Sequence, residues 1–119
     1  DLGPVGALVC YDLRFPELLR EQTAIGADLL VIPAQWPDAR ITQWRILVQA
    51  RAIENQMFVV AANRCGTTGD TTFGGHSMII APDGSILLEA GKTEECKGTM
   101  LDLEMVSAAR ELFSTVPKR

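Results

Sequence analysis

A run of small and apolar residues, Val5 to Val9, ends at Cys10 and is followed at once by the string Y-D-L-R-F-P-E. The run predicts a buried strand over 5–10, and Pro16 stands where the first residue of a helix would lie. A turn between them pushes the thiol out of the sheet, and the positive end of the following helix favours a thiolate. The position therefore suits a nucleophile, although a strand-end cysteine that only packs in the core fits it equally well.

The rest of the chain alternates helices with strands and then turns to hairpins. The patterns predict helices over 16–25, 39–55 and 104–113, and strands over 28–32, 57–63, 77–81, 85–89 and 98–103. Asp38 is expected to cap the second helix, and 33–39 and 66–75 are expected to be loops. The opening strand, helix and strand form a β-α-β unit with a parallel pair, so the predicted fold class is α/β with a layered sheet.

The composition of the chain argues against several classes of partner and site. A chain of 119 residues with net charge −4 lacks the basic stripe that nucleic acid requires, so no nucleic-acid partner is expected. No apolar run approaches the roughly 18 residues of a membrane span and no signal stretch opens the chain, so we expect no membrane partner and a cytoplasmic protein. Three irregularly spaced cysteines and one histidine argue against a disulfide framework and a metal site.

Four ordered blocks resemble the nitrilase, or carbon–nitrogen hydrolase, superfamily. The string C-Y-D-L-R-F-P-E at 10–17 resembles its nucleophile segment, and P-A-Q-W-P at 33–37 resembles the loop after the next strand. A-R-A-I-E-N-Q at 50–56 with N-R-C-G at 63–66 resembles its long helix and the strand beyond, and G-H-S at 75–77 with P-D-G at 82–84 resembles its late hairpin. The resemblance covers nearly the whole chain.

The resemblance implies a fold larger than this chain. Family members carry about as much sequence again before the nucleophile segment, so residues 1–119 are expected to be the C-terminal half of one domain. The implied architecture is the corresponding half of an α-β-β-α four-layer sandwich, with the complete protein a homodimer or larger homo-oligomer. Without its other half, the chain should present an open sheet edge and a bare apolar face.

The resemblance also implies a covalent mechanism. Cys10 would be the nucleophile, and the backbone N–H of Tyr11 would be one oxyanion donor. The family's glutamate base and lysine donor lie upstream of the nucleophile segment, so this piece alone is expected to be inactive. A thiolate would attack the carbon of a small-molecule amide or nitrile, ammonia or an amine would leave, and water would cleave the thioester. No metal or organic cofactor is needed.

Substrate contacts are expected on the loop that follows the second strand. Gln35 and Trp36 lie on it, and a loop aromatic often lines a pocket. Arg40 is a candidate for binding a substrate carboxylate, with a solvated helix-end arginine as the alternative. The pattern W-P-x-x-R-x-x-x-W looks like family members that act as omega-amidases on 2-oxo-acid amides. A nitrilase, a carbamoylase or the glutaminase domain of a larger synthetase would share the scaffold.

Other polar and aromatic residues are expected to have structural roles. Arg14 and Glu17 would hold the turn through an ion pair. Arg51 and Glu54 form either a surface i,i+3 pair or a partly buried scaffold pair behind the site. Trp44 is expected in the core because of its helical spacing.

The histidine and the other two cysteines are not expected to take part in catalysis. His76 is expected to be structural, and Cys65 and Cys96 to be packing residues. A non-catalytic nitrilase-like assembly module, or an inactive truncated product, is the alternative from a different class. A redox-active thiol protein is disfavoured because Cys10 has no resolving cysteine nearby in sequence.

Overall fold

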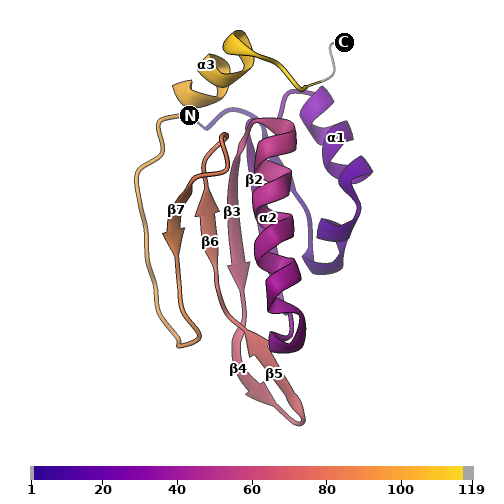
Figure 1. Cartoon of the computed structure of the whole chain (residues 1–119), viewed down its shortest axis with the longest axis vertical. Coiled ribbons are helices and arrows are strands. Elements are labelled where there is room, and N and C mark those ends of the chain that lie inside the picture. The colour runs from indigo at the N-terminus through magenta and orange to yellow at the C-terminus, as the bar shows by residue number, and fades with distance from the viewer. Residues whose placement is uncertain (1, 117–119) are drawn as a thin grey trace.

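The computed structural model describes residues 2–116, and Figure 1 shows how its elements are arranged. The strands are β1 (Val5–Ala7), β2 (Leu29–Ala34), β3 (Phe58–Asn63), β4 (Cys65–Thr68), β5 (Thr71–Gly74), β6 (Met78–Ile80) and β7 (Ile86–Glu89). The α-helices are α1 (Pro16–Ala24), α2 (Ile41–Asn55) and α3 (Glu104–Leu112), with short 3₁₀ helices η1 (Cys10–Arg14) and η2 (Asp38–Arg40). None of these helices is long and apolar enough to cross a bilayer.

A five-stranded sheet in the order β1-β2-β3-β6-β7 forms the body of the molecule. Strands β1, β2 and β3 are parallel, whereas β6 and β7 are antiparallel to their neighbours. The predicted α/β class and the opening β-α-β unit are confirmed. The carboxyl ends of β1, β2 and β3 therefore meet at one edge, which lies at the lower end in Figure 1. In open α/β sheets this edge is where ligands bind.

One face of the sheet is sealed by α1 and α2, and α2 crosses in front of β2 and β3 in Figure 1. Alternate strand residues point to this face. They pack with the helices into one core cluster, which includes Leu30, Ile32, Val59, Ala61, Met78, Ile80, Trp44, Val48 and Ala52. Trp44 is fully buried, which confirms its predicted place in the core.

The opposite face is covered only in part. Val106 of α3 packs against Leu29 and Phe58, at the amino ends of β2 and β3. Towards the carboxyl ends, the apolar side chains of Ala7, Pro33 and Ala62 are exposed. Because an apolar sheet face is normally buried, this region is suited to contact with another polypeptide.

The first strand is shorter than predicted. The last rung of its pairing with β2 is the hydrogen bond from the Leu8 N–H to the Val31 carbonyl, 3.1 Å. The next N–H, that of Val9, donates instead to the carboxylate of Asp12 at 3.0 Å. The Asp12 carboxylate thus takes the place of a β2 carbonyl as the acceptor for the Val9 N–H, and η1 begins at Cys10.

Three other expectations are wrong. The segment 66–75, predicted as a loop, belongs largely to the β4–β5 hairpin, where a two-residue Gly69-Asp70 turn joins threonine-rich strands. No strand forms over 98–103, although Leu101 and Leu103 pack on the partly covered sheet face as their alternation would require. Asp38 does not cap α2, whose N-cap is Arg40; the Asp38 carboxylate lies 2.9 Å from Lys92.

Candidate active site

Cys10 follows β1 in a strained backbone conformation. Its φ is +50°, in the left-handed region that residues other than glycine rarely adopt. Its half-buried side chain lines two cavities, of about 260 Å³ and 440 Å³. The predicted helix start at Pro16 is confirmed, whereas Cys10, predicted as the last residue of the strand, instead opens the five-residue η1.

The smaller cavity contains every residue that the sequence predicted for the site. Its lining residues are Cys10, Tyr11, Arg14, Gln35, Trp36, Pro37 and Arg40. The larger one is more apolar, and is lined by Val9, Cys10, Pro33, Ala34 and Gln35. Two connections that leave the carboxyl ends of β1 and β2 thus meet at the thiol.

The turn that carries Cys10 is held from two sides. Asp12 accepts a hydrogen bond from the Val9 N–H, and its own N–H donates to the Val9 carbonyl, each at 3.0 Å. From α2, the Arg51 Nε donates to the Leu13 carbonyl at 3.0 Å. Arg51 is only 4% exposed and pairs with Glu54 at 3.2 Å. Of the two arrangements that the sequence left open, this is the partly buried scaffold pair, since the Glu54 side chain is 36% exposed.

Arg14 and Arg40 both line the cavity beside Cys10. The Arg14 guanidinium lies 4.7 Å from the Trp36 ring centroid and donates to the Gln43 side chain at 2.7 Å. The predicted Arg14–Glu17 ion pair is absent from residues 2–116. Because arginine stays charged at all physiological pH values, the two guanidinium groups make this cavity suitable for an anionic group.

Trp36 is held in the wall of the cavity. It is only 3% exposed, and its ring centroid lies 5.5 Å from that of Trp44. Its indole N–H donates to the Arg40 carbonyl at 2.9 Å, so the loop closes on itself. Its backbone is bound by Asn63 at the end of β3, a residue that the sequence analysis did not single out. The available signal was that Asn63 ends the strand beside the one from which the Trp36 loop departs.

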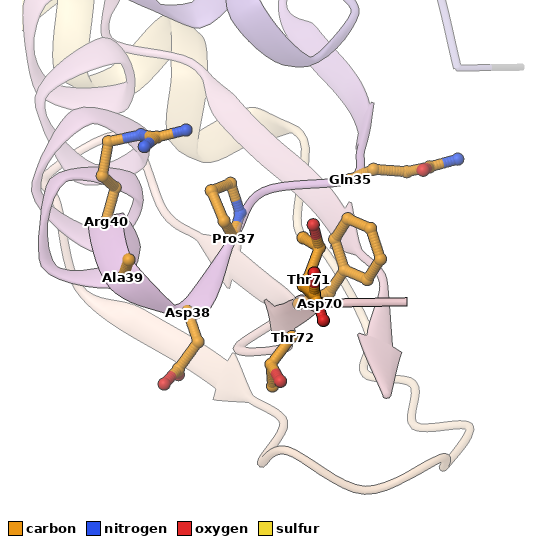
Figure 2. Close-up of a pocket in the computed structure, with 9 residues that line it drawn as sticks. Gln35, Pro37, Asp38, Ala39, Arg40, Asp70, Thr71 and Thr72 are labelled. Carbon is orange, nitrogen blue, oxygen red and sulfur yellow. The ribbon is translucent and has the colours of Figure 1, made fainter. Parts of the chain in front are cut away.

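A wider groove adjoins this cavity on the side of the β4–β5 hairpin (Figure 2). Its volume is about 650 Å³, and its lining residues are Gln35, Pro37, Asp38, Ala39, Arg40, Asp70, Thr71, Thr72 and Phe73. In Figure 2, Gln35 lies across Pro37 from Arg40, and its side chain extends away from Arg40. The Gln35 side-chain Oε1 accepts a hydrogen bond of 3.3 Å from Arg64. Arg40 thus stands at the border of the groove and the cavity.

His76 belongs to a separate polar cluster. Its Nδ1 lies 2.8 Å from the Glu89 carboxylate, which also accepts a 2.6 Å hydrogen bond from Arg45. The bond from Arg45 is the main reason that the pKa of Glu89 is lowered. The His76 carbonyl accepts the indole N–H of Trp44 at 2.8 Å. The cluster therefore supports the core side of α2 and does not line the cavity of Cys10.

The three cysteines are free and lie in different surroundings. Cys65 is half-buried at the start of β4, whereas Cys96 is exposed. The prediction that Cys96 packs in the interior is therefore wrong. Cys10 alone among them lines the cavity with the two arginines.

Comparisons with known proteins place the chain in a family. Residues 1–111 match the carbon-nitrogen hydrolase family. The chain is 47% identical over 104 residues to 2-oxoglutaramate amidase of Bacillus subtilis, an alignment that covers 87% of this chain and 40% of the amidase. The chain thus spans less than half the length of that curated relative.

Two solved structures share the fold. One is a CN-hydrolase superfamily protein from Xanthomonas campestris with an arsenic adduct in its active site, with a TM-score of 0.88 and 34% identity, covering 94% of this chain and 45% of that one. The other is a variant of the Nesterenkonia amidase, in which the acetamide moiety of fluoroacetamide is attached to the active-site cysteine. Its TM-score is 0.70 at 39% identity, covering 74% of this chain and 34% of that one. The chain belongs to the carbon–nitrogen hydrolase family.

Proposed function

We propose that Cys10 is the nucleophile of a hydrolase that cleaves a non-peptide carbon–nitrogen bond, most specifically an amidase acting on a small carboxylate-bearing amide. The observation that carries the proposal is the left-handed backbone of Cys10 beside a cavity lined by two arginines. Strained backbone often occurs at reactive groups, and the guanidinium groups provide the charge that a carboxylate requires. The amidases among the similar proteins support the reaction type, and the covalent cysteine adduct in one of them supports the nucleophile.

The reaction would proceed through a thioester in the complete protein. The Cys10 thiolate adds to the amide carbon, and the backbone N–H of Tyr11 stabilises the oxyanion that forms. The carbon–nitrogen bond breaks as the leaving nitrogen is protonated. Water then attacks the thioester and releases the acid, which regenerates the thiol. The base and the second oxyanion donor are the family's glutamate and lysine, supplied by a segment outside these 119 residues.

The loop 35–40 would determine the substrate. Arg40 pairs with the carboxylate at the far end of the substrate, while Trp36 and Gln35 contact its carbon chain. A 2-oxo-acid amide fits this arrangement, as the similarity to 2-oxoglutaramate amidase suggests. In the complete protein, Arg40→Ala should raise KM for carboxylate-bearing amides and leave neutral amides nearly unchanged. Equal changes for both classes would contradict the assignment of Arg40.

The proposal extends to the form of the complete protein. Residues 1–119 would be the C-terminal half of a four-layer domain whose other half covers the exposed apolar positions Ala7, Pro33 and Ala62. We also propose that the complete protein is a cytoplasmic homo-oligomer. Light scattering of the complete protein tests its size, and a monomer at micromolar concentration would contradict the oligomer.

Single cysteine substitutions in the complete protein test the nucleophile. Cys10→Ser should abolish amide hydrolysis, while the matched Cys65→Ser and Cys96→Ser proteins keep it. An active Cys10→Ser protein would rule out the mechanism. Complete inactivity of the unsubstituted protein toward amides and nitriles would favour the alternative, a non-catalytic assembly module.

A further inference from the structure

The side chain of Asn63 clamps the backbone of Trp36. Its Oδ1 accepts the Trp36 N–H at 2.6 Å, and its Nδ2 donates to the Trp36 carbonyl at 3.2 Å and to the Gly75 carbonyl at 2.8 Å. Asn63 is 8% exposed and lines neither cavity of Cys10. A buried carboxamide that makes three hydrogen bonds is a strong constraint, because each group it leaves unpaired would be costly.

This clamp is one of several attachments of the Trp36 loop to the structure beyond β2. The Gly74 N–H also donates to the Trp36 carbonyl at 2.9 Å, Pro37 forms an isolated antiparallel bridge with Phe73, and Arg64 donates to the Gln35 side chain at 3.3 Å. Within the loop, the Trp36 indole binds the Arg40 carbonyl at 2.9 Å, and the Arg40 N–H binds the Pro37 carbonyl at 3.1 Å. The position of Arg40 is therefore tied to that of Trp36, which Asn63 helps to fix.

We propose that Asn63 is a positioning residue that sets the preference for carboxylates at Cys10, through Trp36 and Arg40. The inference rests on the proposed function, because it takes Arg40 as the group that pairs with the carboxylate. Only a carboxamide both accepts from the Trp36 N–H and donates to two carbonyls in this site. Asparagine is thus required by geometry, although it touches no substrate.

Alkylation of Cys10 in the complete protein tests the inference without requiring turnover. Iodoacetate and iodoacetamide react with a thiolate in the same way, since sulfur displaces iodide, but only iodoacetate carries a carboxylate. The ratio of their rate constants at Cys10, followed by peptide mass spectrometry, measures the preference for an anion. We expect Asn63→Ala to lower this ratio by about threefold to tenfold, as for a weakened charge-assisted contact. Arg40→Ala should lower it to a similar extent.

Ser77→Ala is the matched control. The Ser77 hydroxyl accepts from the Asn63 N–H at 2.9 Å and donates to the Asn63 carbonyl at 3.3 Å, so its loss loosens the same strand end but leaves the carboxamide clamp. The Ser77→Ala ratio should stay near that of the unsubstituted chain. If Asn63→Ala does not fold, Asn63→Ser is measured in its place. Serine is neutral and polar, but it is too short to bond both the N–H and the carbonyl of Trp36.

The outcomes separate the positioning role of Asn63 from the carboxylate-binding role of Arg40. An unchanged ratio in the folded Asn63 variant overturns the inference, as does an equal fall in Ser77→Ala. If Arg40→Ala lowers the ratio and the Asn63 variant does not, the inference fails while the role of Arg40 stands. If the Asn63 variant lowers the ratio and Arg40→Ala does not, Asn63 positions the site but the carboxylate assignment to Arg40 fails.

Discussion

The Nε of Arg51 donates a 3.0 Å hydrogen bond to the carbonyl of Leu13, within the turn that begins at Cys10. Helix α2 thus holds the turn of the candidate nucleophile from behind. Arg51→Lys should lower the free energy of unfolding by about 1–3 kcal/mol, because lysine cannot reproduce the planar group that bonds both Leu13 and Glu54. Urea denaturation measures this. Glu54→Gln, which leaves the bond to Leu13, should cost less than about 1 kcal/mol; equal costs would contradict the account.

The left-handed backbone of Cys10 predicts an unusual response to glycine. Cys10→Gly should be more stable than Cys10→Ala by about 1 kcal/mol, because glycine adopts a positive φ without the strain of a Cβ. Cys65 provides the comparison, since it lies in β4 and is outside the group of positive-φ residues. There the order should reverse, with glycine less stable than alanine. Thermal denaturation of the four variants checks both signs, and the same order at the two positions would refute the strain at Cys10.

The hairpin approaches α2 so closely that position 74 requires glycine. A Cβ on Gly74 would lie 2.8 Å from Cγ1 and 3.0 Å from Cβ of Ile41, the first residue of α2. Gly74→Ala should therefore destabilise the chain by about 1–3 kcal/mol. Ile41→Ala in the same chain should recover part of that cost, so a double-mutant cycle should give a favourable coupling energy. Strict additivity of the two substitutions would show that the close approach is wrong.

The ionisation of Glu89 should make the free energy of unfolding depend on pH. Its hydrogen bond to Arg45 lowers its pKa in the folded state below the ordinary value near 4.5. The ionised form therefore stabilises the fold above that value, and the contribution is lost as the pH falls through the lowered pKa. Glu89→Gln should cost about 0.5–1 kcal/mol at pH 7, since Arg45 is 43% exposed, and this cost should vanish in more acid solution.

Denaturation of Glu89→Gln at several pH values gives that profile. Glu21→Gln, on the exposed surface of α1, is the matched control and should show little effect across the range. A cost for Glu89→Gln that grew as the pH fell would have the wrong sign.

Elements with a strong local pattern were predicted correctly from the sequence. Predictions were wrong where contacts between distant segments determine the structure. Apolar periodicity located α1, α2 and the parallel strands, and block order located the residues around Cys10. The end of β1 was misplaced because Asp12 captures the Val9 N–H, a choice that local propensity does not reveal. The β4–β5 hairpin was missed because its glycines suggested a loop, although Gly69-Asp70 between threonines is a hairpin signal.

Side-chain partners were harder to predict than elements. Arg14 is near Glu17 in sequence, yet it bonds Gln43 and stacks on Trp36, which come from segments far along the chain. Asn63 opens the N-R-C-G block, but nothing local showed that it binds Trp36, since that role depends on the register of β3 beside β2. Such contacts follow from tertiary packing and not from spacing along the chain.

The most direct test of the account is to identify the group that a substrate acylates. The complete protein is mixed with a carboxylate-bearing amide, quenched in acid within a turnover, and digested for mass spectrometry. The account predicts that the acyl mass appears on the peptide containing Cys10, and that the peptides of Cys65 and Cys96 stay unmodified. Turnover with the acyl group on any residue other than Cys10 would contradict it.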